Sequence, residues 1–396
     1  MLGPAFVASV AYVDPGNFAT NVQGGARYGY LLLWVVLAAN LMAMLIQYLS
    51  AKLGVVTDRS LPELCRDRYP RPVAWGLWIQ AEAMAMATDV AEFLGAALGL
   101  NLLFHVPLLP AGFITGVIAF GLLELQRRGF RPFEIGISAL LGLILLGFLY
   151  ETVKIGPSAS GAARGLVPHF AGSGSVYLAV GIIGATVMPH VIYLHSALTK
   201  GRTVLHSDAE RTRMLRFVRI DVLIALGIAG LVNMAMLAVA AKLFHGTPGF
   251  SHVDSIQGAH AGFSHLVGGT AALAFAVALF ASGASSSSVG TYAGQIVMSG
   301  FVNLRISIFF RRALTMIPAL VVLAIGVGPT RALVLSQVVL SFGIPFALIP
   351  LLLLTRRRDV MGIHVNGRLT NAVAAMVAAL ITALNVFLLL SATGIA

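Results

Sequence analysis

Two short polar segments interrupt long apolar runs of the sequence, and their side chains are suited to binding a cation. The segment Asp14–Asn17 reads Asp-Pro-Gly-Asn and supplies a carboxylate and an amide oxygen. The segment Met188–His190 reads Met-Pro-His and supplies a thioether and an imidazole. Because proline lacks an amide proton and clashes with the preceding turn, each segment predicts a break in a helix. The unwound turns would add backbone carbonyls, those of Ala11 and Ala185.

This donor set favours one class of metal. It contains the carboxylate of Asp14, the amide oxygen of Asn17, the sulfur of Met188 and one or two backbone oxygens. Hard cations such as Mg²⁺ and Ca²⁺ prefer oxygen ligands only, whereas sulfur favours softer transition metals. A methionine on a membrane helix usually only packs, but Met188 directly precedes a helix-breaking proline. We therefore expect a site for a divalent transition metal that is carried as substrate, and no resident cofactor.

The composition is that of a membrane protein. Of 396 residues, 58% are hydrophobic and only 10% are charged, whereas soluble domains carry roughly 25% charged residues. The formal net charge is +11, but Lys and Arg fall in short clusters between apolar runs. Such clusters are typical of topology determinants and argue against a nucleic-acid partner. The single cysteine, Cys65, excludes a disulfide within the chain and any Cys-rich zinc or iron–sulfur site.

Apolar runs of about 20 residues predict an all-α polytopic membrane protein. Loop signals such as Asp67–Pro72 separate the runs, and the polar, His-rich segment 246–265 predicts an external loop with a short interfacial helix. The eleven expected spans are 2–26, 30–54, 73–100, 107–125, 132–154, 176–199, 217–243, 266–297, 306–326, 331–354 and 369–392.

The distribution of Lys and Arg predicts the orientation. The loops after even-numbered spans, with the span ends beside them, carry 19 of the 26 Lys and Arg residues, and the opposite loops carry five. The other two, Arg311 and Arg312, lie at the start of span 9. Because cytoplasmic loops are enriched in Lys and Arg, the even loops are expected in the cytoplasm. The N-terminus is then cytoplasmic and the C-terminus external, in the cell membrane.

The two breaks fall in spans 1 and 6, five spans apart. A repeat of five helices is odd, so the second copy must be inverted relative to the first. Paired interrupted helices at matching positions of an inverted repeat indicate the central site of a transporter. The expected organisation is a first repeat over 1–155, a second over 176–354 and an extra helix within 366–396.

Three carboxylates lie on one face of span 3. At 100° per residue, Glu82, Asp89 and Glu92 share a stripe about 80° wide. Carboxylates in an apolar helix should face the bundle interior and need cationic partners or protonation. The candidate partners are Arg311, Arg312 and Arg202. A structural ion-pair network remains the alternative to a role in proton movement.

A proton route can start at the metal site. A dication that binds Asp14 favours its deprotonated form, so the displaced proton needs a nearby path. His190 lies beside Asp14 if the two breaks face each other, and an imidazole exchanges protons near neutral pH. We expect protons to leave through Glu92 and Asp89 toward the arginine pair. A purely structural role is the alternative for His195, five residues further on.

The two motifs together resemble the Nramp family, the natural-resistance-associated macrophage proteins, and the resemblance covers essentially the whole chain. It implies a LeuT-type fold of two inverted five-helix repeats, here with one extra helix, and alternating access. It also implies proton-coupled import of Mn²⁺ and Fe²⁺, with His190 and the span 3 acids linked to proton movement. The implied metal ligands are Asp14, Asn17, Met188, the carbonyls of Ala11 and Ala185, and, in some states, Gln337. The resemblance further implies a cytoplasmic segment before span 1, which is where we expect the sequence to depart from the family.

Two other classes of protein fit the sequence less well. A sodium-coupled amino-acid carrier shares the architecture, but a buried Asp beside an Asn and a Met suits an anionic substrate poorly. An intramembrane hydrolase would need a nucleophile with a base or a His-Glu-x-x-His motif, and the Gly-x-Ser stretches fall in loops without an evident base. The sequence thus predicts a transporter rather than an enzyme, with metal ions, protons and the lipid bilayer as partners, acting as a monomer.

Overall fold

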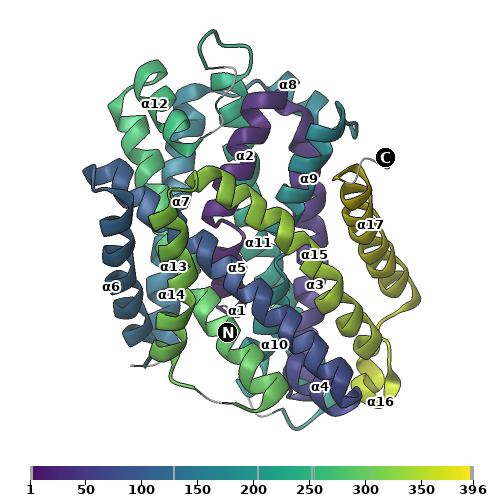
Figure 1. The fold of residues 1–396 in the computed structure, drawn as a ribbon. Helices are drawn as coiled ribbons and strands as arrows, with labels where there is room; N and C mark the ends of the chain where they lie inside the picture. Colours follow the sequence, from purple (N-terminus) through teal and green to yellow (C-terminus); the bar gives the residue numbers. More distant parts are fainter. Residues whose placement is uncertain are drawn as a thin grey trace.

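The computed structural model describes residues 3–127, 130–202, 205–250, 253, 255–304 and 306–392, and this part of the chain is helical without strands (Figure 1). The ends of the predicted ranges, residues 1, 2 and 393–396, and the predicted loop residues 128 and 129 lie outside the described residues. The long helices are α3 (Leu33–Thr57), α5 (Arg71–Phe104), α6 (Leu108–Arg127), α7 (Phe130–Ile155), α11 (Asp208–Phe244), α13 (Gly269–Val302), α14 (Ile308–Ile325), α15 (Pro329–Thr355) and α17 (Arg368–Ala392).

Two crossings are each built from two half-helices. The first consists of α1 (Pro4–Ala11) and α2 (Pro15–Tyr28), and the second of α9 (Ser173–Thr186) and α10 (Pro189–Thr199). These breaks fall at the two predicted polar segments. The short elements are η1 (Gly29–Leu32), α4 (Leu61–Arg68), α8 (Ala159–Gly165), α12 (Ile256–Leu266), α16 (Arg358–Met361) and η2 (Gly362–His364).

The crossings agree with the eleven predicted spans. Among the described residues, eight helical runs are long and apolar enough to cross a membrane. One of them, Pro15–Thr57, has 43 residues, or about 65 Å of helix against a hydrocarbon core of about 30 Å. It must contain two crossings, and the chain turns at Gly29, whose φ is 60°. Dividing this run gives one more crossing, and the helices α6 and α14 give two more, so the described part of the chain has eleven crossings.

Proline at the first helical position explains where the second half-helices begin. Pro15 starts α2 and Pro189 starts α10, where the missing amide proton costs no hydrogen bond. The carbonyls freed by the first break are satisfied by side chains: Asn233 donates to Tyr12 O at 2.7 Å, and Ser282 donates to Val13 O at 2.6 Å. The break therefore lies in protein rather than lipid, as irregular backbone at membrane depth must.

The predicted loop at Asp67–Pro72 is wrong in part. Asp67 still lies within the helix α4, and α5 already begins at Arg71. A capping box starts α4: Ser60 N and Oγ donate to Glu63 Oε2 at 2.7 and 2.8 Å. Such reciprocal capping stabilises a first turn even in a short polar helix. The eight-residue length and the charged composition hid α4 from a search for apolar runs.

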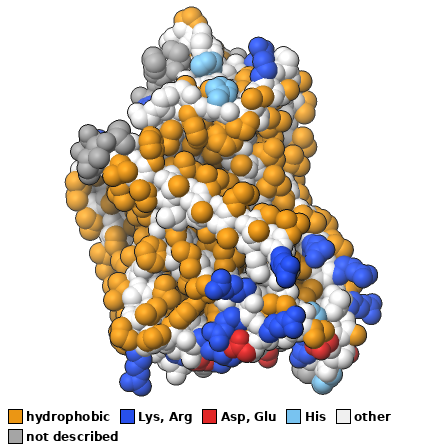
Figure 2. Space-filling model, turned by 90° about the vertical axis from the view of Figure 1, so that its right-hand side faces the viewer, with side chains coloured by type: hydrophobic (Ala, Val, Ile, Leu, Met, Phe, Trp, Pro, Cys, Tyr) orange, Lys and Arg blue, Asp and Glu red, His pale blue; other side chains and the backbone are white. Residues whose placement is uncertain are grey.

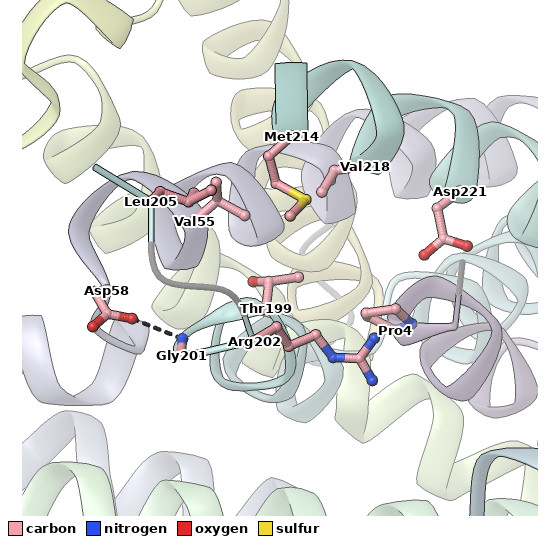
Figure 3. Close-up of a pocket in the computed structure, with 10 residues that line it drawn as sticks. All are labelled: Pro4, Val55, Asp58, Thr199, Gly201, Arg202, Leu205, Met214, Val218 and Asp221. Atoms are coloured by element: carbon pink, nitrogen blue, oxygen red, sulfur yellow. Dashed lines mark hydrogen bonds between the residues drawn. The ribbon is translucent and has the colours of Figure 1, made fainter. Parts of the chain in front are cut away.

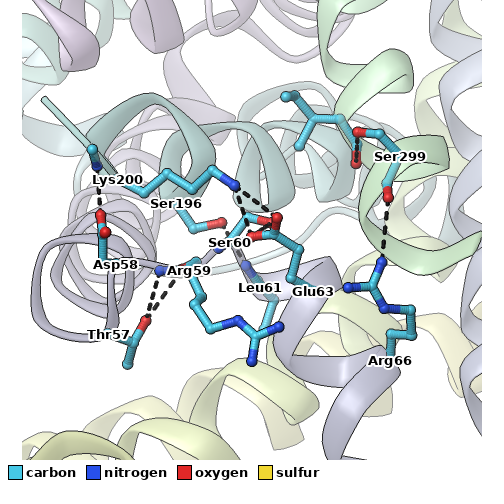
Figure 4. Close-up of polar contacts among 12 residues, drawn as sticks. Thr57, Asp58, Arg59, Ser60, Leu61, Glu63, Arg66, Ser196, Lys200 and Ser299 are labelled. Carbon is cyan, nitrogen blue, oxygen red and sulfur yellow. Dashed lines mark hydrogen bonds and ion pairs between the residues drawn. The ribbon is translucent and has the colours of Figure 1, made fainter. Parts of the chain in front are cut away.

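Hydrogen bonds between residues in and beside α3, α4 and α10 stabilise the lower end of the bundle (Figure 4). Lys200 Nζ, just after α10, donates to Glu63 Oε1 at 2.7 Å, and Leu61 N donates to Ser196 Oγ at 2.9 Å. Asp58 Oδ1, at the end of α3, accepts from Gly201 N at 2.7 Å. The second half of the broken crossing is thus tied to α3 and α4 where it leaves the bundle.

The Glu63–Lys200 ion pair should make stability depend on pH. Partial burial works to raise the pKa of Glu63, but hydrogen bonds from Lys200 and Ser60 outweigh burial and lower this pKa. A lowered pKa stabilises the fold above the ordinary value of about 4.3 and the contribution is lost as the pH falls through the lowered value. Lys200→Met should cost about 0.5–1 kcal/mol at pH 7 and little at pH 3, measured by thermal unfolding in detergent. An equal loss at both pH values would contradict this.

The outer surface matches a chain that crosses a bilayer. Large apolar side chains face outward, such as Val153 at 76% exposure, Ile325 at 72% and Leu369 at 78%. Figure 2 shows an extended apolar face with Lys and Arg side chains gathered toward its lower end. In Figure 1, α4 and α16 lie at this lower end, and α8 and α12 lie at the upper end.

Candidate metal site

The two helix breaks meet inside the bundle through the side chain of Asn17. Its Nδ2 donates to Asp14 Oδ1 at 2.8 Å, on its own side, and to Ala185 O at 3.0 Å, at the end of α9. Thr186 Oγ1 donates to Asn17 Oδ1 at 3.5 Å. Met188 follows two residues later, directly before α10, and Asp14, Asn17 and Met188 are all fully buried. The predicted donors from both breaks therefore share one interior region.

Asp14 holds its place because it caps α2. Its Oδ1 accepts the backbone N–H of Asn17 at 2.8 Å, and its own backbone is extended, with φ −77° and ψ 169°. An aspartate at this position satisfies an amide that would otherwise lack a partner. The other oxygen, Oδ2, accepts only a long contact of 3.4 Å from Gln337 Nε2 among the described side chains. One carboxylate oxygen is thus structural, and the second is turned toward α15.

Gln337, on α15, lies over both breaks because glycines let it approach. A Cβ added at Gly16 would lie 1.9 Å from Gln337 Nε2, and one added at Gly184 would lie 1.9 Å from Gln337 O. Gln337 is fully buried, and its Oε1 has no hydrogen-bond partner within the described part of the chain. Gln337 thus lies beside both breaks and contacts Asp14, and its approach to the metal stays a prediction.

The carboxylates of α5 divide into two ion pairs and one unpaired acid. Glu82 accepts from both Nη atoms of Arg311 at 3.1 and 2.7 Å, and Asp89 Oδ1 lies 3.5 Å from Arg312 Nη1. Both arginines are buried, at 2% and 0% exposure. Arg312 also donates to Ser287 of α13. The predicted arginine pair of span 9 therefore meets the predicted stripe of span 3.

Glu92 lies between this network and the metal region. Neither of its carboxylate oxygens has a hydrogen-bond partner among the described residues. Its Oε2 and Asp89 Oδ1 lie 2.4 and 3.2 Å from the position of a Cβ on Gly290, so both acids face the same point of α13. One turn along α5, a Cβ on Gly95 would lie 2.1 Å from the Pro15 ring. Glu92 is thus one helical turn from Gly95, which packs against Pro15 at the first break.

Arg202, expected beside the carboxylates of α5, instead forms its described ion pair with Glu134 of α7. It lines a cavity of about 220 Å³ at the lower end of the bundle, together with Pro4 and Asp221 (Figure 3). Asp221 of α11 accepts the backbone N–H of Ala5 at 3.0 Å and so caps α1. Arg202 lies three residues beyond the end of α10, whereas His190 lies at the start of that helix.

The two histidines of α10 have different surroundings. His190 Nδ1 lies 3.3 Å from Thr88 Oγ1 of α5, and its Nε2 has no partner among the described groups. His195 Nδ1 lies 2.9 Å from Gln47 Oε1 of α3. Gln47 Nε2 in turn donates to Tyr12 OH at 2.6 Å. His195 therefore takes part in a hydrogen-bond chain between helices, whereas His190 lies at the second break; the Nε2 of each ring has no hydrogen-bond partner among the described groups.

Several polar residues of the interior were not found from the sequence. Gln47 and Asp221 organise the surroundings of α1, and each lies in a span without a local motif. Glu151 of α7 is fully buried, and its oxygens have no hydrogen-bond partner in the described structure. A lone acid or amide in an apolar run was the available signal, and it would have identified all three.

Comparison with known proteins agrees with this geometry. A family model described as natural resistance-associated macrophage protein-like, Nramp, matches residues 5–391. A relative from Deinococcus radiodurans described as divalent metal cation transporter MntH is 54% identical over 388 residues, which cover 98% of this chain and 89% of the relative. A Bacillus subtilis relative of the same description is 53% identical over 389 residues, with 98% and 91% covered.

The solved structures agree in fold. The manganese transporter of Eremococcus coleocola, crystallised with an aromatic bis-isothiourea compound, superposes with a TM-score of 0.89 at 33% identity, over 97% of this chain and 85% of that one. A nucleobase-cation-symport-1 family transporter has a TM-score of 0.64 at 14% identity, over 96% and 87%, which concerns the fold alone. The chain is a multi-pass membrane transporter with the LeuT-type fold, not an enzyme. It belongs to the Nramp family.

Proposed function

We propose that this chain imports divalent transition metals, Mn²⁺ or Fe²⁺, by alternating access and that protons move with the metal. The observation that carries the proposal is the position of Asn17, whose amide bridges the Asp14 carboxylate and the Ala185 carbonyl. Two electronegative oxygens from different half-helices converge on one point. A small cation at such a point joins both breaks, so its binding can be coupled to their relative movement.

The donor chemistry fits a transition dication. Turning the Asn17 amide by 180° exchanges its nitrogen for its oxygen, and a third oxygen then joins those of Asp14 and Ala185. Met188 would add a thioether, Ala11 would add a second carbonyl and, when α15 moves, Gln337 would add its Oε1. A mixed set of oxygen and soft sulfur favours Mn²⁺ and Fe²⁺ over Mg²⁺ and Ca²⁺.

An amino-acid carrier is disfavoured by the same geometry. Carriers of this architecture present the N-terminus of a half-helix to the carboxylate of the substrate. Here the Asp14 side chain already accepts the backbone N–H of Asn17 at the start of α2. A substrate carboxylate would have to replace this carboxylate and would be repelled by it.

The proton route follows α5 away from the site. We propose that Asp14, with His190 beside it, releases a proton on metal binding and that Glu92 accepts it. The proton then moves to Asp89, the partner of Arg312, and on to Glu82, the partner of Arg311, about 15 Å along α5 from Glu92. Glu92 suits the accepting role because its oxygens lack hydrogen-bond partners among the described groups. Arg202 is left out of this route because of its pairing with Glu134.

Orientation and organisation remain part of the proposal. The excess of Lys and Arg in the even loops supports a cytoplasmic N-terminus, an external C-terminus and a location in the cell membrane. Residues 1–155 and 176–354 would form the two inverted repeats, with 366–396 as the extra helix. We expect the chain to act as a monomer, because each donor group named above comes from one copy.

Uptake into proteoliposomes tests the function. Purified protein is reconstituted with a metal-sensitive dye in one set of vesicles and a pH-sensitive dye in another. Mn²⁺ and Fe²⁺ should enter together with protons, which acidify the lumen, whereas Mg²⁺ should not enter. Metal uptake without any pH change would exclude proton coupling, and a lack of uptake with either metal would exclude the proposed substrate.

Met188→Ala should change selectivity more than rate. Without sulfur the remaining ligands are oxygens, which Ca²⁺ accepts as readily as Mn²⁺ does. We expect Mn²⁺ uptake to persist at a reduced rate and the preference for Mn²⁺ over Ca²⁺ to fall by about tenfold or more. The measurement is competition of Ca²⁺ with Mn²⁺ uptake, with Met234→Ala, a partly buried methionine of α11, as the matched control. An unchanged preference would mean that Met188 only packs.

A further inference from the structure

A basic cavity lies between α3, α11 and the segment that precedes α17. It has a volume of about 350 Å³, in the size range of ligand sites. Its lining includes three cationic side chains and no carboxylate: Lys52 of α3, and Arg216 and Arg219 of α11. Thr212 and Tyr48 add hydroxyl groups, so the wall offers hydrogen-bond donors suited to an oxyanion.

The cations of this cavity lack a countercharge. Lys52 is 8% exposed, and its Nζ donates to the neutral amide oxygen of Asn366 at 2.8 Å. Arg219 donates to Tyr48 OH at 3.3 Å and lies over the Tyr48 ring at 5.1 Å. Arg216 has no ion-pair or hydrogen-bond partner among the described residues. The like charges of Lys52 and Arg219 repel each other. A buried ammonium without an anionic partner is costly, and an anion in the cavity would supply that partner.

Asp208 is an acidic group at the edge of this cavity, beside the lining residue His364. Asp208 Oδ1, at the start of α11, lies 3.2 Å from Arg211 Nη1 and 3.8 Å from His364 Nε2. Its side chain is 55% exposed, and it is absent from the cavity lining. The Asp208 carboxylate therefore compensates positive charge at the outer rim of the cavity. It leaves the charges of Lys52, Arg216 and Arg219 uncompensated.

An exposed apolar stripe of α11 adjoins the cavity. On α11, Arg216 and Arg219 continue along one helical stripe into Ile220 and Leu223, which are 43% and 52% exposed. A cationic pocket that leads directly into an exposed apolar stripe matches a molecule with an anionic head and a hydrocarbon tail. Figure 2 shows Lys and Arg side chains gathered at this end of the apolar surface.

We propose that this cavity binds the phosphate group of an anionic phospholipid, with the acyl chains along the apolar stripe of α11. Lys52, Arg216 and Arg219 would hold the phosphate oxygens, as basic pockets between membrane helices hold lipid headgroups. The bound lipid would contact α3, α11 and the segment that precedes α17. Asn366 holds this segment in place, because its Nδ2 donates to Thr355 Oγ1 at 2.8 Å. The lipid should therefore stabilise the lower end of the bundle.

The test is thermal unfolding of the full chain in detergent, titrated separately with phosphatidylglycerol, phosphatidylcholine and inorganic phosphate. Phosphatidylglycerol should raise the unfolding temperature at concentrations where phosphatidylcholine does not. Near a membrane surface each basic residue contributes about fivefold to binding. Arg216→Gln/Arg219→Gln should therefore need about thirtyfold more phosphatidylglycerol for the same rise. Arg213→Gln, an exposed arginine of the same helix outside the cavity, is the matched control and should respond as the unmodified chain does.

Three results would overturn the proposal. An equal response of the double variant and the control would mean that phosphatidylglycerol binds the basic surface without using the cavity. Stabilisation by inorganic phosphate as large as that by phosphatidylglycerol would assign the cavity to a free phosphate group. If the double variant does not fold, Arg216→Gln alone is decisive, because this exposed side chain has no described partner to lose; a shift of less than about twofold, against the expected fivefold, would exclude the site.

Discussion

Asp14→Asn is expected to reduce Mn²⁺ uptake into proteoliposomes at least about a hundredfold while leaving the fold intact. The new asparagine side chain keeps an oxygen that can accept the hydrogen bond from Asn17 N and so cap α2. The local structure should therefore persist. The substitution removes the negative charge that a dication needs, and loss of groups that only support metal ligands already costs 10–100-fold. Gln337 can turn its unpartnered Oε1 toward the new amide, which avoids a clash of donors.

The control for this result is the same chemical change outside the site. Asp359→Asn alters an exposed carboxylate, 50% accessible, at the lower end of the bundle. It should leave uptake unchanged. Both variants should elute as single species and unfold near the temperature of the unmodified chain. Substantial Mn²⁺ uptake by a well-folded Asp14→Asn protein would remove the central ligand of the proposed site.

The sequence was most informative where local chemistry alone determines structure. A proline at residue 15 or 189 favours a helix start, and Asp14 before the first of them can cap the helix, so both breaks could be predicted. Their separation by five spans then predicted the fold class. Span boundaries followed from apolar length, because lipid requires a nearly continuous helix.

The rest depends on which helices touch, which the sequence does not encode locally. The Asn17–Ala185 contact joins residues 168 positions apart. The choice of Arg312 for Asp89, and of Glu134 for Arg202, depends on how α5, α7, α10 and α14 pack. The helical face shared by Glu82, Asp89 and Glu92 could be predicted, but which of them stays unpaired could not.

The Asp89–Arg312 pair allows the second large effect to be measured. Both side chains are buried, at 1% and 0% exposure. Arg312→Met leaves the Asp89 carboxylate without its cation, and breaking a buried pair in this way typically costs about 3–5 kcal/mol. We expect a marked fall in the unfolding temperature in detergent. We also expect metal-driven acidification of proteoliposomes to be lost, because the proton path is interrupted after Glu92.

The double variant Asp89→Asn/Arg312→Met separates a structural role from proton transfer. Removing both charges relieves the uncompensated carboxylate, so most of the lost stability should return. If the pair only stabilises the bundle, acidification should return with the stability. If the pair carries protons, the variant should be stable, bind Mn²⁺ and still fail to acidify the vesicles. Glu63→Gln/Lys200→Met removes an ion pair outside the spans and should leave acidification intact. Because stability and proton flux are measured on the same preparation, the two roles predict opposite results for one protein, and we expect a stable but uncoupled transporter.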